Sequence, residues 1–96
     1  GKGRRNYKML KCIFSSPTEK RVEPDIQGIF FETSTGQRGV LPNHISMVAY
    51  LKPGSIVRLK KNMGELVFRI GISSFFRIIK NEAIISTQEF KEEKEY

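Results

Sequence analysis

Short apolar runs recur along this chain, separated by Gly, Pro, Asn and Ser, and several of them alternate strictly between apolar and polar positions. The clearest alternation spans residues 55–61, and residues 65–70 continue it after the turn at Asn62-Met63-Gly64. A side-chain period of two is the period of a β-strand, and Asn and Gly are typical residues of a hairpin turn. The pattern therefore predicts an all-β fold, either a sandwich or a barrel.

The runs predict roughly eight to ten short strands, each paired with a neighbour in the chain or across a hairpin. Pro24 cannot donate to a strand ladder, so residues 24–25 should form an edge or a bulge. Residues 52–55 form a strong turn signal, because Pro presets φ and Gly is free to adopt a positive φ. Residues 45–51 fit either a strand or a single helical turn. The expected strands are residues 7–14, 20–22, 26–33, 38–41, 55–61, 65–70, 75–79 and 83–86.

The end of the chain has a different character. Residues 88–96 are polar and rich in helix-forming residues, which predicts the first turns of a helix. The expected division is a basic N-terminal extension at 1–6, a β-sandwich at 7–88 and a polar tail at 89–96 that starts a truncated or lost helical region.

The composition of the chain limits its size class, its partners and the metal sites it can form. The 96 residues allow one domain with a modest core, and the net charge of +7 favours an acidic partner, although a plain solubilising surface fits equally well. Cys12 is the only cysteine and His44 the only histidine, which excludes a Cys/His zinc site and makes a buried structural thiol the expectation for Cys12. No apolar run is long enough to cross a bilayer as a helix.

No catalytic arrangement emerges from the motifs. His44 lies in a loop without a neighbouring acid, the serines lack a G-x-S-x-G context, and neither phosphate-loop nor dinucleotide fingerprints are present. The acids do not pair in a metal-binding pattern. We therefore expect no catalytic, cofactor-binding or metal-binding residues, and a protein that is not an enzyme.

Two strand segments could serve nucleic-acid binding. Residues 67–69 (Val-Phe-Arg) and 75–77 (Phe-Phe-Arg) set aromatics beside bases, as in small barrels that bind single strands. Neighbouring residues of a strand point to opposite faces, so at least one aromatic should enter the core. A small basic β-barrel that binds single-stranded nucleic acid is kept as the alternative function.

Residues 36–44 read Gly-Gln-Arg-Gly-Val-Leu-Pro-Asn-His, and Lys-Pro-Gly follows at 52–54. This resembles the N-terminal β-sandwich of the epsilon subunit of rotary F-type ATP synthases, called delta in mitochondria. The family pattern runs Gly-Glu-hydrophobic-Gly, two hydrophobic residues, Pro-x-His and then Lys-Pro-Gly. The match has no gap over 36–54, and weaker similarity covers most of residues 7–88.

The departures from that pattern are as informative as the match. The family often has an acid where this chain has Gln37 and an apolar residue where it has Arg38. Its usual Gly-Gly pair is Gly71-Ile72 here, and residues 17–25 are longer than usual. The helical hairpin that carries ATP binding and inhibition in some members is outside the similarity, so those activities do not carry over.

The resemblance implies a two-sheet sandwich that serves as a non-catalytic central-stalk (rotor) subunit. It implies binding to the gamma subunit, possible contact with the membrane c-ring, and association with alpha and beta subunits through the complex. The expected location is peripheral to a membrane, on the cytoplasmic side in bacteria or the matrix side in an organelle, without direct insertion. By position, the resemblance assigns the gamma-facing surface to Leu41, Pro42, Asn43 and His44, and the ring-facing surface to Gln37 and Arg38.

Overall fold

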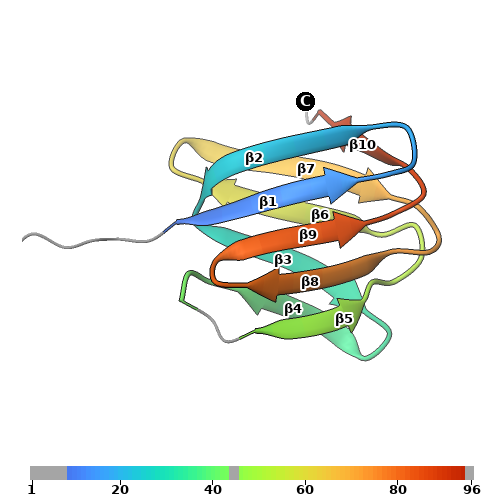
Figure 1. Ribbon diagram of the computed structural model, residues 1–96, viewed down its shortest axis with the longest axis horizontal. Coiled ribbons are helices and arrows are strands. Elements are labelled where there is room, and N and C mark those ends of the chain that lie inside the picture. The colour runs from blue at the N-terminus through green and yellow to red at the C-terminus, as the bar shows by residue number, and fades with distance from the viewer. Residues whose placement is uncertain (1–8, 44–45, 95–96) are drawn as a thin grey trace, which may run out of the picture.

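The computed structural model describes residues 9–43 and 46–94, which form ten strands in two five-stranded sheets (Figure 1). Sheet A contains, in spatial order, β2 (Lys20–Ile26), β1 (Leu10–Ser15), β9 (Glu82–Ser86), β8 (Phe75–Ile79) and β5 (Met47–Tyr50). Sheet B contains β10 (Phe90–Glu93), β7 (Gly64–Ile70), β6 (Ile56–Lys61), β3 (Gly28–Thr33) and β4 (Gly36–Val40). The expected two-sheet sandwich is confirmed, and residues 47–50 form a strand rather than a helical turn.

The pairing of the strands is less local than the sequence suggested. β1 and β9 lie side by side and parallel although they come from opposite ends of the chain, while β3 pairs with β6 and β5 with β8. The expectation that every strand pairs with a neighbour or across a hairpin was therefore wrong. Turn residues in the sequence predict only those strand pairs that a hairpin joins. In a sandwich the chain also crosses from one sheet to the other, and the strand pairs that result have no turn between them.

The core fills the space between the sheets. Phe14 of sheet A packs on Phe68 of sheet B with ring centroids 4.3 Å apart, and Phe31 packs on Phe76 at 4.6 Å. Alternate residues along each strand point inward, as the period of two requires. The fully buried side chains are Phe14, Phe68, Phe76, Leu10, Ile26, Ile29, Leu59, Ile78, Ile85, Val40, Val57 and Cys12.

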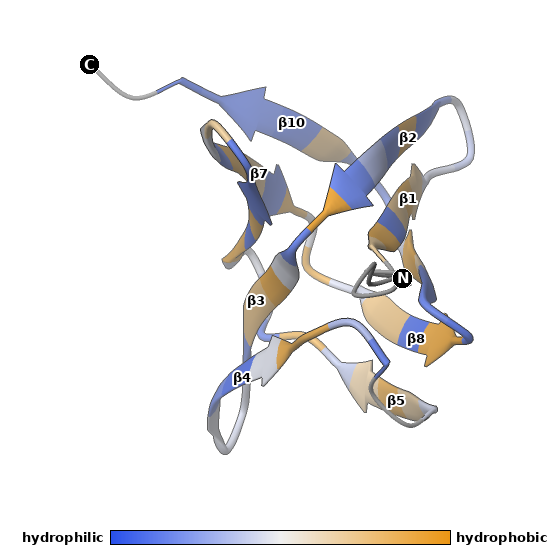
Figure 2. Cartoon of the chain, turned by 90° about the vertical axis from the view of Figure 1, so that its left-hand side faces the viewer, coloured by the Kyte–Doolittle hydropathy of each residue, from blue (hydrophilic) through white to orange (hydrophobic). Residues whose placement is uncertain are grey.

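The tail is a strand where a helix was expected. Phe90–Glu93 forms β10 and pairs antiparallel with β7, although Figure 2 shows most of β10 as hydrophilic. The Phe90 ring lies 5.4 Å from the Phe14 ring, so one apolar anchor and an open sheet edge outweigh a helix propensity that is only a weak prior. The helical expectation for residues 90–93 was wrong, and the sandwich continues through them.

A charged rim closes the sandwich where β2 meets β10. Arg21 of sheet A binds Glu92 of sheet B at 2.9 Å and Glu23 of its own strand at 2.7 Å. Its guanidinium lies 5.1 Å from the centroid of the Phe68 ring, and Lys61 approaches Glu23 at 3.6 Å. The four charges therefore cover the end of the aromatic core instead of leaving it open to water.

The expected irregularities around Pro24 are present. β2 is an edge strand, and its register against β1 shifts between Leu10 and Cys12. The strand nevertheless continues to Ile26 rather than ending at residue 22. The turn at 52–55 is also confirmed, because Ser55 donates its amide to the Lys52 carbonyl at 3.1 Å and Gly54 has a φ of 67°.

The position of the Phe30 ring explains why residue 39 of the sequence motif is a glycine. Phe30 points to the outer face of sheet B, directly opposite Gly39 of β4. A β-carbon at Gly39 would lie 2.8 Å from the Phe30 ring, and one at Gly28 would lie 2.9 Å from it. The two glycines therefore leave the space that lets the ring lie against the sheet.

We expect Phe90→Ala to lower the free energy of unfolding by about 2 kcal/mol, because it removes the ring that packs on Phe14. The matched control is Lys91→Ala, an exposed neighbour on the same strand, with an expected change within about 0.5 kcal/mol. Urea unfolding monitored by circular dichroism measures both. Equal effects would mean that β10 adds no packing to the core.

We expect Gly39→Ala to destabilise the domain by about 1–2 kcal/mol through overpacking against Phe30. Phe30→Leu removes the ring that the new methyl group would strike. The double variant should therefore be more stable than the sum of the single effects by about 1 kcal/mol. A double-mutant cycle in urea tests this, and simple additivity would contradict the ring contact.

Candidate functional site

The loop that follows β4 carries most of the residues that the resemblance assigns to a partner. Leu41 is 56% exposed although it is apolar, and Pro42 is half-buried. Asn43 has a φ of 67°, a left-handed conformation that asparagine tolerates better than most residues. His44 lies outside the described residues. The loop thus presents an apolar side chain to solvent beside a rigid proline.

A pair of asparagines anchors this loop to the opposite sheet. Asn43 donates its main-chain N–H to Oδ1 of Asn81 at 2.6 Å, and Nδ2 of Asn81 donates to Oδ1 of Asn43 at 3.3 Å. Asn81 sits in the β8–β9 turn, where it and Lys80 have φ values of 65° and 51°, as a type I′ hairpin turn requires. We call these two hydrogen bonds the Asn43–Asn81 clamp. The clamp fixes the end of β4, in sheet B, against a hairpin of sheet A.

The two residues assigned to the ring lie elsewhere. Gln37 and Arg38 are the exposed second and third residues of β4, whereas Leu41–Asn43 follow the end of the strand. Gln37 and Arg38 line an open hollow on the outer side of sheet B together with Phe30, Arg58 and Glu65. Of the six assigned positions, Gln37 and Arg38 therefore belong to the strand and Leu41, Pro42 and Asn43 to the loop after it, while His44 lies outside the described residues.

An apolar band crosses the outer face of sheet A. Val48, Ile84, Ile13 and Val22 lie in one row across five strands, interrupted only by Arg77 of β8. Val48 is 61% exposed and Val22 47%, although both are aliphatic. We call this row the sheet A band. Aliphatic residues gathered on one face are a typical sign of a surface that another molecule covers.

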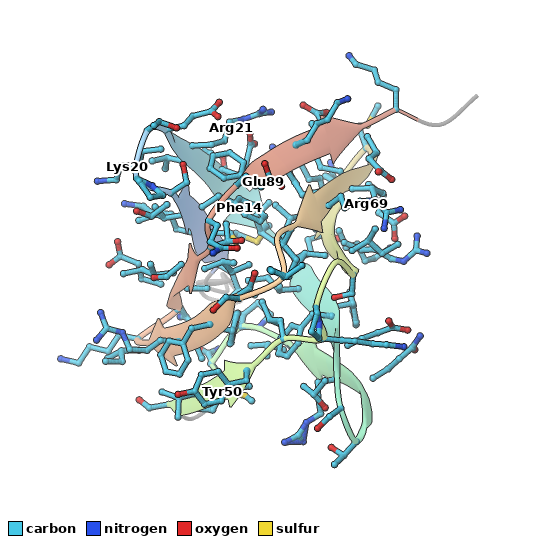
Figure 3. The ribbon with its side chains drawn as sticks, turned by 90° about the vertical axis from the view of Figure 1, so that its right-hand side faces the viewer. Phe14, Lys20, Arg21, Tyr50, Arg69 and Glu89 are labelled. Atoms are coloured by element: carbon cyan, nitrogen blue, oxygen red, sulfur yellow. The ribbon has the colours of Figure 1, made fainter. Side chains whose placement is uncertain are left out.

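Further apolar side chains widen the band at its β5 end. Tyr50 is 78% exposed and packs edge-on against Phe75 with ring centroids 5.1 Å apart. Ile79, at the end of β8, is 48% exposed. Figure 3 shows Tyr50 at the β5 rim, far from Arg21 at the charged rim. Exposed apolar side chains therefore continue the band to the β5 edge of sheet A.

The outer face of sheet B is different in character. Arg69 binds Glu93 at 2.5 Å and donates to the Gly54 carbonyl at 2.9 Å, while Arg58 approaches Glu65 at 3.5 Å. The hydrogen bond from Arg69 holds the pKa of the Glu93 carboxyl below its usual range. Two ion pairs therefore mark the outer face of sheet B, in contrast to the aliphatic row on the outer face of sheet A.

The described residues offer little that could perform chemistry. Burial raises the pKa of the Cys12 thiol, with Glu23 adding to the effect, and the side chain is fully buried as expected. Across residues 9–43 and 46–94, no group of three His, Cys, Asp or Glu side chains could hold a metal ion. The same part of the chain contains no helix long and apolar enough to span a membrane.

The aromatics that suggested nucleic-acid binding belong mainly to the core. Phe68 and Phe76 are fully buried, which confirms that one aromatic of each segment points inward. Phe75 is half-buried against Tyr50, and Arg69 is bound to Glu93. An interleaved series of exposed rings and free bases is therefore missing from the described surface, and the nucleic-acid alternative is not favoured.

Two features of the site were not predicted from the sequence. The sheet A band has a detectable signal, because strands with apolar residues on both faces, such as Ile84-Ile85 and Ile78-Ile79, are typical of strands covered on both sides. The Asn43–Asn81 clamp joins positions 38 residues apart, and nothing in the local sequence links them.

Comparison with known proteins agrees with this geometry. The family model of the ATP synthase delta/epsilon chain β-sandwich domain matches residues 9–93. The ATP synthase epsilon chain of Anoxybacillus flavithermus is 43% identical over 61 residues, covering 62% of this chain and 45% of that protein. The epsilon chain of Mycolicibacterium vanbaalenii is 35% identical over 60 residues, covering 62% and 49%. The chain thus spans less than half the length of these two relatives in the matched regions.

Solved structures share the fold. A chain of the Euglena gracilis mitochondrial ATP synthase, in a structure of OSCP, F1 and c-ring, superposes with a TM-score of 0.77 at 22% identity, covering 88% of this chain and 53% of that one. A chain of the Tetrahymena thermophila mitochondrial ATP synthase central stalk and c-ring gives 0.70 at 12% identity, covering 91% and 69%. With the family model matched over nearly the whole described sandwich, this chain belongs to the family of ATP synthase delta/epsilon chain β-sandwich domains.

Proposed function

We propose that this chain is a non-catalytic rotor domain of an F-type ATP synthase or ATPase, which binds the gamma subunit and helps couple it to the c-ring. The observation that carries the proposal is the sheet A band, together with the β4–β5 loop, which carries the exposed Leu41 and is joined to the β8–β9 hairpin of sheet A through Asn43 and Asn81. A surface of this kind is suited to a permanent protein partner, since obligate interfaces are the more apolar ones. The family membership indicates which partners to consider.

The gamma-facing surface, in this proposal, has two connected parts. Leu41, Pro42 and Asn43, with His44 at the next position, form the first, and the β5 end of the sheet A band forms the second. The Asn43–Asn81 clamp supports the connection, because it holds the loop against the hairpin that carries Ile79. A loop that is fixed before binding loses less conformational entropy when the partner docks.

The ring-facing surface would be the other end of β4. Gln37 and Arg38 are exposed next to a turn of small polar residues, so this end could approach loops of a ring without burying apolar surface. Arg38 gives the contact a basic character, which suits a neutral or acidic ring loop. The alpha and beta subunits would be reached only through the complex, and the domain would lie peripheral to the membrane, on the cytoplasmic or matrix side.

The test is direct binding to purified gamma subunit of the same organism. We expect Ile84→Asp, in the centre of the sheet A band, to weaken binding at least tenfold, which corresponds to about 1.4 kcal/mol. The matched control is Ile56→Asp, another half-buried isoleucine but on the outer face of sheet B, with a change below about twofold. Isothermal titration calorimetry measures both. Equal losses, or no binding by the unchanged chain, would refute the proposal.

The clamp can be tested separately. Asn81→Gly keeps the positive φ of the turn but deletes both hydrogen bonds to Asn43, so we expect gamma binding to weaken by roughly fivefold, the effect of about one hydrogen bond. Lys80→Gly changes the neighbouring residue of the same turn and leaves the clamp in place. If the two variants bind gamma alike, the loop does not depend on the clamp.

A further inference from the structure

The two sheets end in four edge strands, and one of them differs from the rest. β2 carries Pro24 and a register shift, β10 carries Lys91 and two glutamates, and β4 carries Arg38 between two glycines. Charge, proline and irregular pairing are the features that keep edge strands from accepting further strands. β5 has none of them, because Met47–Tyr50 is an uncharged Met-Val-Ala-Tyr segment.

The register shows which main-chain groups of β5 point outward. Leu51 donates its N–H to the Ser74 carbonyl at 3.0 Å, so the Leu51–Ser74 pair is of the hydrogen-bonded type. These pairs alternate with non-hydrogen-bonded ones along an antiparallel ladder. The main-chain N–H and C=O groups of Val48 and Tyr50, which lie opposite Arg77 and Phe75, therefore point away from β8.

The next main-chain N–H that points away from β8, that of Lys52, already has a hydrogen-bond partner. Lys52 donates its N–H to the Glu32 carbonyl of β3 at 2.8 Å, which closes the edge at that end. For Val48 and Tyr50, the described part of the chain provides no comparable hydrogen-bond partner. The open edge is thus confined to two residues whose side chains are also among the most exposed apolar ones, at 61% and 78%.

We propose that β5 receives an extended strand of the partner subunit, which pairs with the main-chain groups of Val48 and Tyr50 and extends sheet A. This inference rests on the proposed function and adds how the partner is held. The added strand would place alternate apolar side chains next to Val48 and Tyr50, continuing the sheet A band, since side chains of adjacent strands lie in rows. Acidic residues of the partner would face Lys52 and Arg77, which flank this edge.

A strand from the partner fits this edge better than a second copy of the chain. Pairing β5 with its own copy would bring two molecules of net charge +7 together, with Lys52 and Arg77 of each near the junction. Sedimentation of the free chain provides the check. We expect a monomer, and a dimer broken by Val48→Pro would overturn the assignment of the edge to the partner.

Amide hydrogen exchange, followed by NMR on the ¹⁵N-labelled chain, tests the pairing directly. In the free chain, the amides of Ala49 and Leu51 should exchange slowly because they pair with β8, while those of Val48 and Tyr50 exchange fast. With saturating purified gamma subunit, we expect protection at Val48 and Tyr50 to rise at least tenfold. Binding without that rise would overturn strand pairing and leave the proposed function intact, whereas no binding at all would overturn both.

A proline variant gives an independent readout. Val48→Pro deletes an outward N–H without removing a bond to β8, and proline is tolerated at such positions of edge strands. Val48→Thr is the matched variant, because it reduces apolar contact but keeps the N–H. We expect Val48→Pro to bind gamma at least tenfold more weakly than Val48→Thr, with both variants showing the native circular dichroism spectrum. Equal affinities would show that the main chain of β5 does not take part.

Discussion

The contact between Phe14 and Phe68 is the interaction on which the rest of the sandwich depends. The two rings come from different sheets, are fully buried and lie 4.3 Å apart, so they fix how closely the sheets approach. Phe90 packs on the same ring, and Arg21 lies over Phe68 while it binds Glu92. Core and charged rim are therefore one connected structure, and the sequence positions from 14 to 92 that build it are brought together only by the fold.

The two rims of the sandwich are closed by different means, and this gives them different surface chemistry. At the β2–β10 rim, ion pairs cover the core and leave little apolar surface. At the β4–β5 rim, the connections are hydrogen bonds between uncharged groups. The main-chain N–H of Asn43 donates to the side-chain amide of Asn81, and the main-chain N–H of Lys52 donates to the main-chain carbonyl of Glu32. Charged side chains are costly to desolvate in an interface, whereas an apolar rim with its polar groups already satisfied is not. Val48 and Tyr50, two of the most exposed apolar side chains, lie at this second rim.

Much of the architecture could be predicted from the sequence, because strands with a period of two and turns at Pro53-Gly54 are local properties. The strand at Phe90–Glu93 could not, since its composition favours a helix and only the open edge of β7 and the ring of Phe14 reverse that preference. The parallel pairing of β1 with β9 was missed because no turn connects them. At the site, the resemblance named the loop residues, but the clamp to Asn81 and the sheet A band depend on contacts between distant strands.

The proposed rotor function requires a domain that is held against rotation as well as against dissociation, and the surfaces available for such contacts converge at β5. The β4–β5 loop, the sheet A band and the open main-chain edge point in different directions, yet all three meet at this strand. An apolar face alone permits sliding, because hydrophobic attraction has no preferred direction. Main-chain hydrogen bonds fix register along the strand, and a preformed loop fixes the position at its end. A partner that used all three would be fixed in place and orientation, which is what transmission of torque requires.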